Sequence, residues 1–187
     1  MKQPFNVVVL NGSPQASSRT RVLLATIVES LGWDASSVDS IALHELVQHI
    51  GGALLRDDLP LVAQEAFDRI ESADLLLVGC PVYRAGIPGL FKHLFDLVDM
   101  STMKGKRVLL AATGGSDRHT LVIDHHLRPL FAFFQALVLP VGVYAGPTDI
   151  ISEEIVNPAL RDQIALAAAA ASPWLPQRDP VMSEVAA

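Results

Sequence analysis

The chain has 187 residues, of which 50% are hydrophobic and 18% are charged, with a net charge of −6. This length fits one domain with its own core, and the composition excludes a disordered chain. No dense lysine or arginine cluster stands out, so we do not expect nucleic acid as a partner. The apolar run ending at Leu10 is too short for a signal core or a membrane span. We therefore expect no membrane association and a cytoplasmic location.

Five apolar runs predict the strands of the fold. They cover residues 7–10, 36–43, 74–81, 108–112 and 138–143. Continuous apolar runs are typical of strands that are buried on both faces of a parallel sheet. The run at 36–43 is only weakly patterned, which places it near an edge of the sheet.

Apolar residues at helical spacing predict five helices. They cover residues 18–31, 64–72, 88–98, 121–137 and 157–171. Pro129 interrupts the fourth helix, and Asn157 followed by Pro158 is a typical helix start. Residues 44–62 are predicted to form a variable loop with a short helix.

Strands alternate with helices along the chain, which predicts an α/β fold with a parallel sheet. Five strands suit a flavodoxin-like three-layer sandwich of strand order 2-1-3-4-5. We assign this domain to residues 1–173 and expect residues 174–187 to form a tail that is mobile or packs on another subunit. Ligands of such folds bind at the carboxyl ends of the strands, so the loops after the first, third and fourth strands are the candidate site.

The first loop, residues 12–20, follows the first strand and enters a helix. Gly12 would permit a tight turn. Ser13, Ser17, Ser18 and Thr20 supply hydroxyl donors, and Arg19 supplies a positive charge; the candidate ligand residues are Ser13, Ser18, Arg19 and Thr20. Free N–H groups and the helix dipole at such a position attract an anion, and Arg19 could pair with phosphate oxygens. A polar turn with a serine cap explains the composition equally well.

The second loop, residues 81–89, follows the third strand. Two prolines and two glycines give it a constrained backbone that could approach a ligand closely. Its candidate residues are Pro81, Val82 and Tyr83, which could offer backbone donors and an apolar wall to a flat flavin ring. The simpler alternative is a rigid turn with a surface tyrosine.

The third loop, residues 113–119, follows the fourth strand. Thr113 and Ser116 offer hydrogen bonds, while Gly114 and Gly115 would let a planar ring lie against the main chain. Alone, this is only a glycine-rich loop. Three such loops at strand ends, in this order, favour a flavin site.

Together these segments resemble the NAD(P)H-dependent FMN reductase family over about residues 5–171. The matching residues are Asn11-Gly12-Ser13-Pro14 with Ser18 and Thr20, Pro81-Val82-Tyr83 with Gly86, Gly89-Leu90-Phe91-Lys92, and Ala112-Thr113-Gly114-Gly115. The resemblance implies FMN together with NADH or NADPH. It also implies hydride transfer from nicotinamide C4 to flavin N5, a reaction between cofactors that needs no catalytic side chain.

A closer resemblance is to the reductases of two-component sulfonate monooxygenases. It rests on residues 112–116, His119 and residues 124–130. In that branch the long fourth helix carries a π-bulge at a tetramer interface, and the tyrosine of the alkanesulfonate type is replaced here by His125, which favours the methanesulfonate type. The resemblance implies FMN bound reversibly as a substrate, a partner FMN-dependent sulfonate monooxygenase, and a homo-oligomer, expected to be a tetramer. His125 and His126 would then be bulge or interface residues that tune flavin retention.

Three further features have simple explanations. Adjacent histidines point in different directions on a helix, so we expect no metal at His125 and His126. Cys80 ends a buried strand and is expected to pack as a small hydrophobe. Arg84 and the Asp117-Arg118 pair could meet the nicotinamide nucleotide or simply be solvated.

Other functions stay open on the sequence alone. A quinone, azo-dye or chromate reductase could use the same fold with tightly held FMN. An electron-carrier flavodoxin or a flavin-binding regulator would lack turnover with NAD(P)H, although flavodoxins are usually more acidic than a charge of −6. The sequence does not choose between NADH and NADPH.

Overall fold

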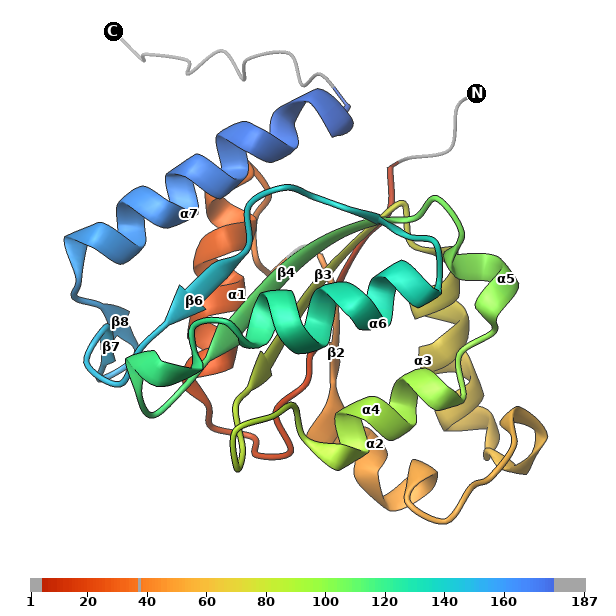
Figure 1. Ribbon diagram of the computed structural model, residues 1–187. Helices are drawn as coiled ribbons and strands as arrows, with labels where there is room; N and C mark the ends of the chain where they lie inside the picture. Colours follow the sequence, from red (N-terminus) through yellow and green to blue (C-terminus); the bar gives the residue numbers. More distant parts are fainter. Residues whose placement is uncertain (1–4, 37, 177–187) are drawn as a thin grey trace, which may run out of the picture.

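The computed structural model describes residues 5–36 and 38–176. Its centre is a parallel β-sheet of order β2-β1-β3-β4-β5, with β6 also paired to β4 (Figure 1). The strands are β1 (Val7–Asn11), β2 (Asp39–Ala42), β3 (Leu75–Pro81), β4 (Arg107–Thr113), β5 (Leu137–Val138) and β6 (Val143–Ala145). The predicted flavodoxin-like order is confirmed, and the weakly patterned strand β2 lies at an edge as expected.

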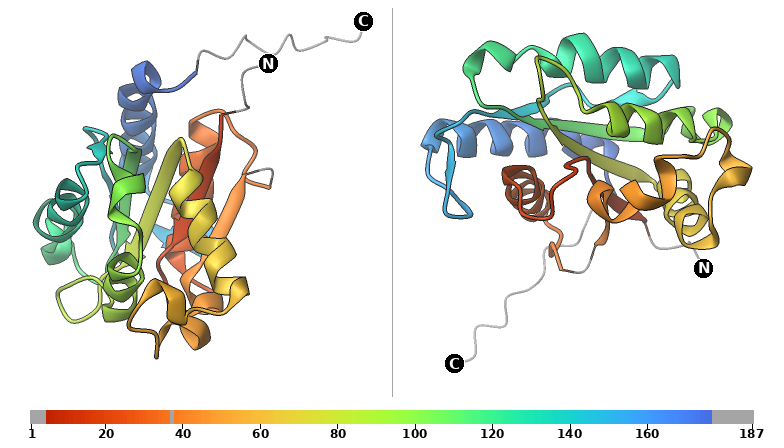
Figure 2. Two further views of the ribbon diagram at one scale, coloured as in Figure 1. Left: turned by 90° about the vertical axis from the view of Figure 1, so that its right-hand side faces the viewer. Right: turned by 90° about the horizontal axis from the view of Figure 1, so that it is seen from below.

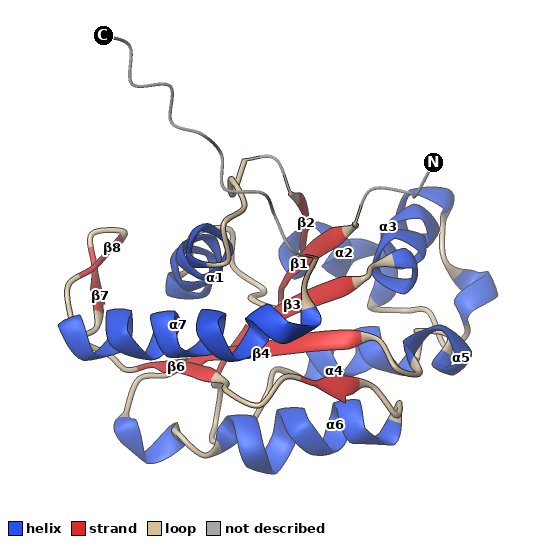
Figure 3. Ribbon diagram, turned by 90° about the horizontal axis from the view of Figure 1, so that it is seen from above, coloured by secondary structure: helices blue, strands red, loops and turns tan. Residues whose placement is uncertain are grey.

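Helices cover both faces of the sheet (Figures 2 and 3). One face packs against α1 (Arg19–Ser30) and α7 (Pro158–Ala171). The opposite face packs against α2 (Leu43–Ile50), α3 (Leu61–Ser72), α4 (Gly89–Asp96), α5 (Met100–Met103) and α6 (Arg128–Phe133). Successive strand residues alternate between the two cores, which is why the strands are apolar without interruption.

The predicted fifth strand at 138–143 is wrong as a single strand, because it is split into β5 and β6. Pro140 lies in the break and has no N–H to donate to the sheet. Side chains bind the carbonyl groups of this segment instead. Arg128 donates to the oxygens of Leu139 and Pro140 at 3.3 and 2.7 Å, and Gln163 donates to that of Gly142 at 3.1 Å.

The helix predicted at 121–137 contains a π-helical segment, Ile123–Leu127, followed by α6. Pro129 is the second residue of α6, in its first turn, where a residue without an N–H is tolerated. The helix ends four residues earlier than predicted, at Phe133, and Gln135 then adopts a left-handed conformation with φ of 56°.

Two smaller elements differ from expectation. A hairpin of β7 (Ile150–Ile151) and β8 (Glu154–Ile155) was not predicted, since its turn residues Ser152 and Glu153 carry no glycine or asparagine signal although both have positive φ. The α3 helix begins three residues before the predicted start. Short 3-10 helices occupy Arg56–Asp58, Asp117–His119 and Ser172–Trp174.

Of the tail predicted at 174–187, residues 177–187 lie outside the described residues. Within residues 5–36 and 38–176, every helix is too short or too polar to cross a lipid bilayer.

Candidate functional site

The three predicted loops line one cavity of about 410 Å³. They meet because the parallel strands β1, β3 and β4 all end at the same edge of the sheet, at the lower left in Figure 1. The lining residues are Ser13, Gln15, Ser17, Ser18, Arg19, Thr20, Pro81, Val82, Tyr83, Thr113, Gly114 and Gly115. This volume lies in the range of about 300–1,000 Å³ that is usual for small-molecule sites.

The first loop is shaped by its own polar side chains. Asn11 Oδ1 accepts from the Ser13 N–H at 3.1 Å, and Ser13 Oγ accepts from the Gln15 N–H at 3.1 Å. Ser18 is the N-cap of α1, and its hydroxyl accepts from the Arg21 N–H. The helix leaves its other first-turn N–H groups without partners of its own, so this end of the cavity suits an anion.

Gly12 is needed for a reason other than the predicted tight turn. A Cβ atom at this position would lie 2.4 Å from Cδ2 of Phe91 and 3.0 Å from Cβ of Cys80. The first loop therefore starts in direct contact with the core, and glycine is the residue that fits.

The third loop packs against Tyr144, a residue of β6. A Cβ atom at Gly114 would lie 2.0 Å from the Tyr144 hydroxyl oxygen, so glycine is required there by packing. The hydroxyl donates to the Ser116 carbonyl at 2.6 Å. Burial raises the pKa of Tyr144, helped by Asp117 and Asp149 and opposed by Arg19, so the hydroxyl stays a donor. Gly115, in contrast, has open space around its Cβ position.

Arg19 and Thr20 join the first loop to the third. The Arg19 guanidinium donates to the carbonyl groups of Gly146 at 2.9 Å and Gly114 at 3.1 Å. The Thr20 and Thr113 hydroxyls form a buried hydrogen bond of 2.8 Å. Three of the predicted ligand residues, Arg19, Thr20 and Thr113, are therefore engaged with the protein itself.

The second loop contains a turn that closes on itself. Tyr83 and Gly86 exchange backbone hydrogen bonds of 2.9 and 3.1 Å. The two residues between them, Arg84 and Ala85, are left-handed, with φ of 50° and 69°. Non-glycine residues are uncommon in this conformation, which costs roughly 1–2 kcal/mol for each. The side chain of Tyr83 is 40% exposed.

His125 and His126 lie in the π-helical segment and line a different cavity, of about 830 Å³, between α4 and α6. This cavity is bordered by apolar side chains that include Phe133, which is 67% exposed. His126 also reaches the second loop, since a Cβ atom at Gly86 would lie 3.5 Å from its Cε1. The π-helical segment thus lies beside the Tyr83–Gly86 turn, in which Tyr83 lines the three-loop cavity.

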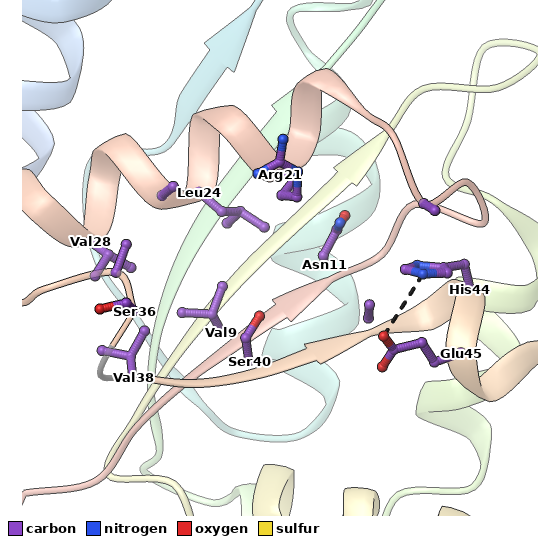
Figure 4. A pocket seen from close by; sticks show the side chains of 14 residues that line it. Val9, Asn11, Arg21, Leu24, Val28, Ser36, Val38, Ser40, His44 and Glu45 are labelled. Carbon is purple, nitrogen blue, oxygen red and sulfur yellow. Dashed lines mark ion pairs between the residues drawn. The ribbon is translucent and has the colours of Figure 1, made fainter. Parts of the chain in front are cut away.

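A further cavity, of about 490 Å³, lies between α1 and β2 (Figure 4). Leu24 and Val28 of α1 face Val9 and Val38 across it, and His44 lies 3.9 Å from Glu45 at its polar end. It shares no lining residue with the three-loop cavity. The first loop separates the two cavities.

The placement of the other candidates is mixed. Ser116 is not among the lining residues; its hydroxyl caps the 3-10 helix Asp117–His119. The side chains of Arg84 and Arg118 are exposed. Cys80 is fully buried, and burial raises the pKa of its thiol to about 12, so it stays a protonated packing residue.

Sequence reasoning missed two residues of this region. Gln15 lines the cavity but was not singled out within the first loop, whereas Ser17, expected as a hydroxyl donor, does line it. Tyr144 was missed because it lies 28 residues after the Ser116 carbonyl that it binds, and no local pattern marks it.

The geometry suits a ligand with an anionic group at one end and a flat ring at the other. The α1 end supplies N–H groups and serine hydroxyls, while Val82, Tyr83 and the open face of Gly115 border the rest of the cavity. An FMN molecule has this distribution of groups, and the residues present fit it.

Comparisons with known proteins agree with this fit. The sequence profile of the family described as "NADPH-dependent FMN reductase" matches residues 5–149. An "FMN reductase (NADPH)" from Pseudomonas aeruginosa is 49% identical over 175 residues, covering 92% of this chain and 94% of that protein. An "NADH-dependent FMN reductase SfnF" from Pseudomonas putida is 51% identical, covering 86% of this chain and 87% of that protein.

The fold has a solved counterpart as well. The structure of an oxidoreductase from Corynebacterium diphtheriae superposes with a TM-score of 0.76 at 30% identity, covering 91% of this chain and 96% of that one.

Proposed function

The chain belongs to the NADPH-dependent FMN reductase family and is thus an oxidoreductase that uses FMN and NAD(P)H, and from this premise we propose that the three-loop cavity is its flavin site. The meeting of the three loops around one cavity carries this proposal. The first loop binds the phosphate through its free N–H groups and through Ser17 and Ser18. The ring lies between Pro81, Val82 and Tyr83 on one side and Gly115 on the other.

The protein's part in the reaction is to position and to stabilise. When bound, FMN supplies the N5 atom that receives hydride from the nicotinamide. Residues of the second and third loops would hold the ring and leave one of its faces accessible to the nicotinamide. The Gly115 N–H is a donor placed to stabilise negative charge on the ring.

We further propose that FMN is a substrate that leaves after reduction and is consumed by an FMN-dependent sulfonate monooxygenase. Two features support this: the resemblance of residues 112–116 and 124–130 to sulfonate-system reductases, and the π-helical segment Ile123–Leu127 beside the second loop. His126, in contact with Gly86, is the residue through which this segment influences flavin retention.

The apolar face around the α4–α6 cavity is the proposed contact surface between subunits. Met100, Leu121 and Phe133 are 57%, 59% and 67% exposed on and near it. Exposed apolar side chains that border an apolar cavity are typical of an interaction site. A homotetramer built through this face would bury His125 and His126.

The test combines flavin retention, steady-state kinetics and a coupled assay. Purified protein is loaded with FMN, dialysed, and assayed with NADH and with NADPH. We expect the dialysed protein to lose its FMN, and the two-substrate kinetics to give intersecting lines. Addition of a purified sulfonate monooxygenase and methanesulfonate should release sulfite only when reductase, FMN and pyridine nucleotide are all present.

Retention of stoichiometric FMN with parallel-line, ping-pong kinetics would instead identify a reductase with a prosthetic flavin, of the quinone, azo-dye or chromate type. In that case the free-flavin proposal is wrong, while membership of the family is unaffected.

A further inference from the structure

Arg19 is directed away from the loop in which it lies. Its guanidinium donates to Gly114 O and Gly146 O, in segments that are 95 and 127 residues away along the chain. Hydrogen bonds from a charged group are stronger than those between neutral groups. The side chain therefore ties the start of α1 to the segments that follow β4 and β6.

Tyr144 holds the same loop at its other end. Its hydroxyl donates to Ser116 O at 2.6 Å, and the residue is only 7% exposed. Arg19 thus binds the carbonyl group of Gly114, and Tyr144 binds that of Ser116. Both anchors lie on elements outside the third loop.

The hydrogen bond to the Gly114 carbonyl also sets the direction of the Gly115 N–H, which is a hydrogen-bond donor. The N–H of Gly115 belongs to the same planar trans peptide group as the Gly114 carbonyl, so the two point in opposite directions. With its carbonyl held by Arg19, this peptide group presents the Gly115 N–H on the opposite side. Gly115 lines the three-loop cavity and has open space at its Cβ position.

We propose that Arg19 and Tyr144 are positioning residues, which act on the flavin ring by orienting the Gly114–Ser116 backbone, and that Arg19 does not act chiefly as a phosphate ligand. The proposal rests on the flavin site proposed above. It differs from the sequence-based expectation, in which Arg19 pairs with phosphate oxygens.

Riboflavin, which has the same ring as FMN but no phosphate, separates the two roles. Equilibrium titrations of both flavins are made with wild type, Arg19→Ala and Tyr144→Phe. We expect each variant to weaken FMN and riboflavin by the same factor, about tenfold, because each substitution removes one hydrogen bond to the Gly114–Ser116 backbone. The visible absorption of the bound flavin should shift, and the KM for NAD(P)H should stay unchanged.

Ser17→Ala is the matched control in the first loop, because Ser17 lines the cavity at the proposed phosphate end. It should weaken FMN and leave riboflavin unchanged. Arg19→Ala behaving in the same way, or leaving both flavins unaffected, would overturn the Arg19 proposal. Unchanged binding of both flavins by Tyr144→Phe would overturn the proposal that Tyr144 is a positioning residue.

Gly115→Leu tests the underlying site separately, because its side chain would project into open space of the cavity. Loss of both flavins confirms the site; unchanged binding means that the flavin site itself is wrong. Far-UV circular dichroism and thermal unfolding accompany each variant. If Arg19→Ala does not fold, Tyr144→Phe, which removes one oxygen atom, still decides whether the third loop is positioned from β6.

Discussion

The second and third loops form two sides of the same cavity but are held in different ways. The third loop is bound from outside: by Arg19 of α1, by Tyr144 of β6, and by the Thr20–Thr113 hydroxyl pair. The Tyr83–Gly86 turn of the second loop is closed by its own two backbone hydrogen bonds and places two left-handed non-glycine residues at its tip.

Because of this difference, the third loop is expected to be rigid and the Tyr83–Gly86 turn of the second loop is expected to move more easily. A wall anchored by several distant elements keeps its shape whether or not a ligand is present, and can aim donors at a ring without reorganising. A self-closed, exposed turn has few interactions that resist displacement. If the flavin enters and leaves this cavity, as proposed above, it meets one fixed side and one side that adapts, and the adaptable side includes Gly86, which lies beside His126.

The largest expected effect is on the fixed side, with Gly114→Ala. The new Cβ would lie 2.0 Å from the Tyr144 hydroxyl oxygen, so either the loop or the tyrosine must move. We expect a loss of stability of about 1–3 kcal/mol, typical of overpacking, and FMN binding weakened by about tenfold or more. Urea unfolding and FMN titration measure the two effects.

Gly115→Ala is the control for this change, since nothing lies within 4 Å of its Cβ position; its stability should match the wild type. Adding Tyr144→Phe to Gly114→Ala removes the clashing oxygen and should recover part of the lost stability. If Gly114→Ala is as stable as Gly115→Ala, the packing of Gly114 against Tyr144 does not hold the third loop in place.

A smaller effect is expected on the adaptable side, with Ala85→Gly. Glycine adopts positive φ without the steric cost that alanine has at 69°. We expect the protein to become more stable by up to about 1 kcal/mol, with kcat within twofold of wild type. Urea unfolding measures the change in stability.

The same substitution at Ala35, a loop residue without positive φ, should be neutral or destabilising. A destabilised Ala85→Gly variant would show that the turn is held by contacts of the alanine methyl group, and the contrast between the two sides would be lost.

Much of this arrangement follows from local sequence. The ends of the apolar runs place the three loops at one edge of a parallel sheet, and the serine before α1 marks its cap. The π-helical segment was expected from the resemblance of residues 124–130, and the structure has it at Ile123–Leu127.

The remainder depends on interactions between residues far apart in sequence. The acceptors of Arg19 and the tyrosine beneath Gly114 lie in other elements, so the composition of the first loop could not show that the arginine is engaged with the protein. The break between β5 and β6 depends on how Arg128 and Gln163 bind carbonyl groups around Pro140. The β7–β8 hairpin turns at Ser152 and Glu153, without the glycine or asparagine that two-residue hairpin turns favour.

Hydrogen exchange with and without FMN tests the location and character of the site most directly. Saturating FMN should slow exchange in residues 12–20, 81–86 and 113–116, and leave residues 38–45 of the cavity in Figure 4 unchanged. The gain in protection should be largest in the exposed Tyr83–Gly86 turn, which is closed by its own two hydrogen bonds, and small at the buried Gly114, whose N–H donates to Ala145 O of strand β6 at 2.9 Å. Protection confined to residues 38–45, with no change in the three loops, would contradict the assignment of the flavin site.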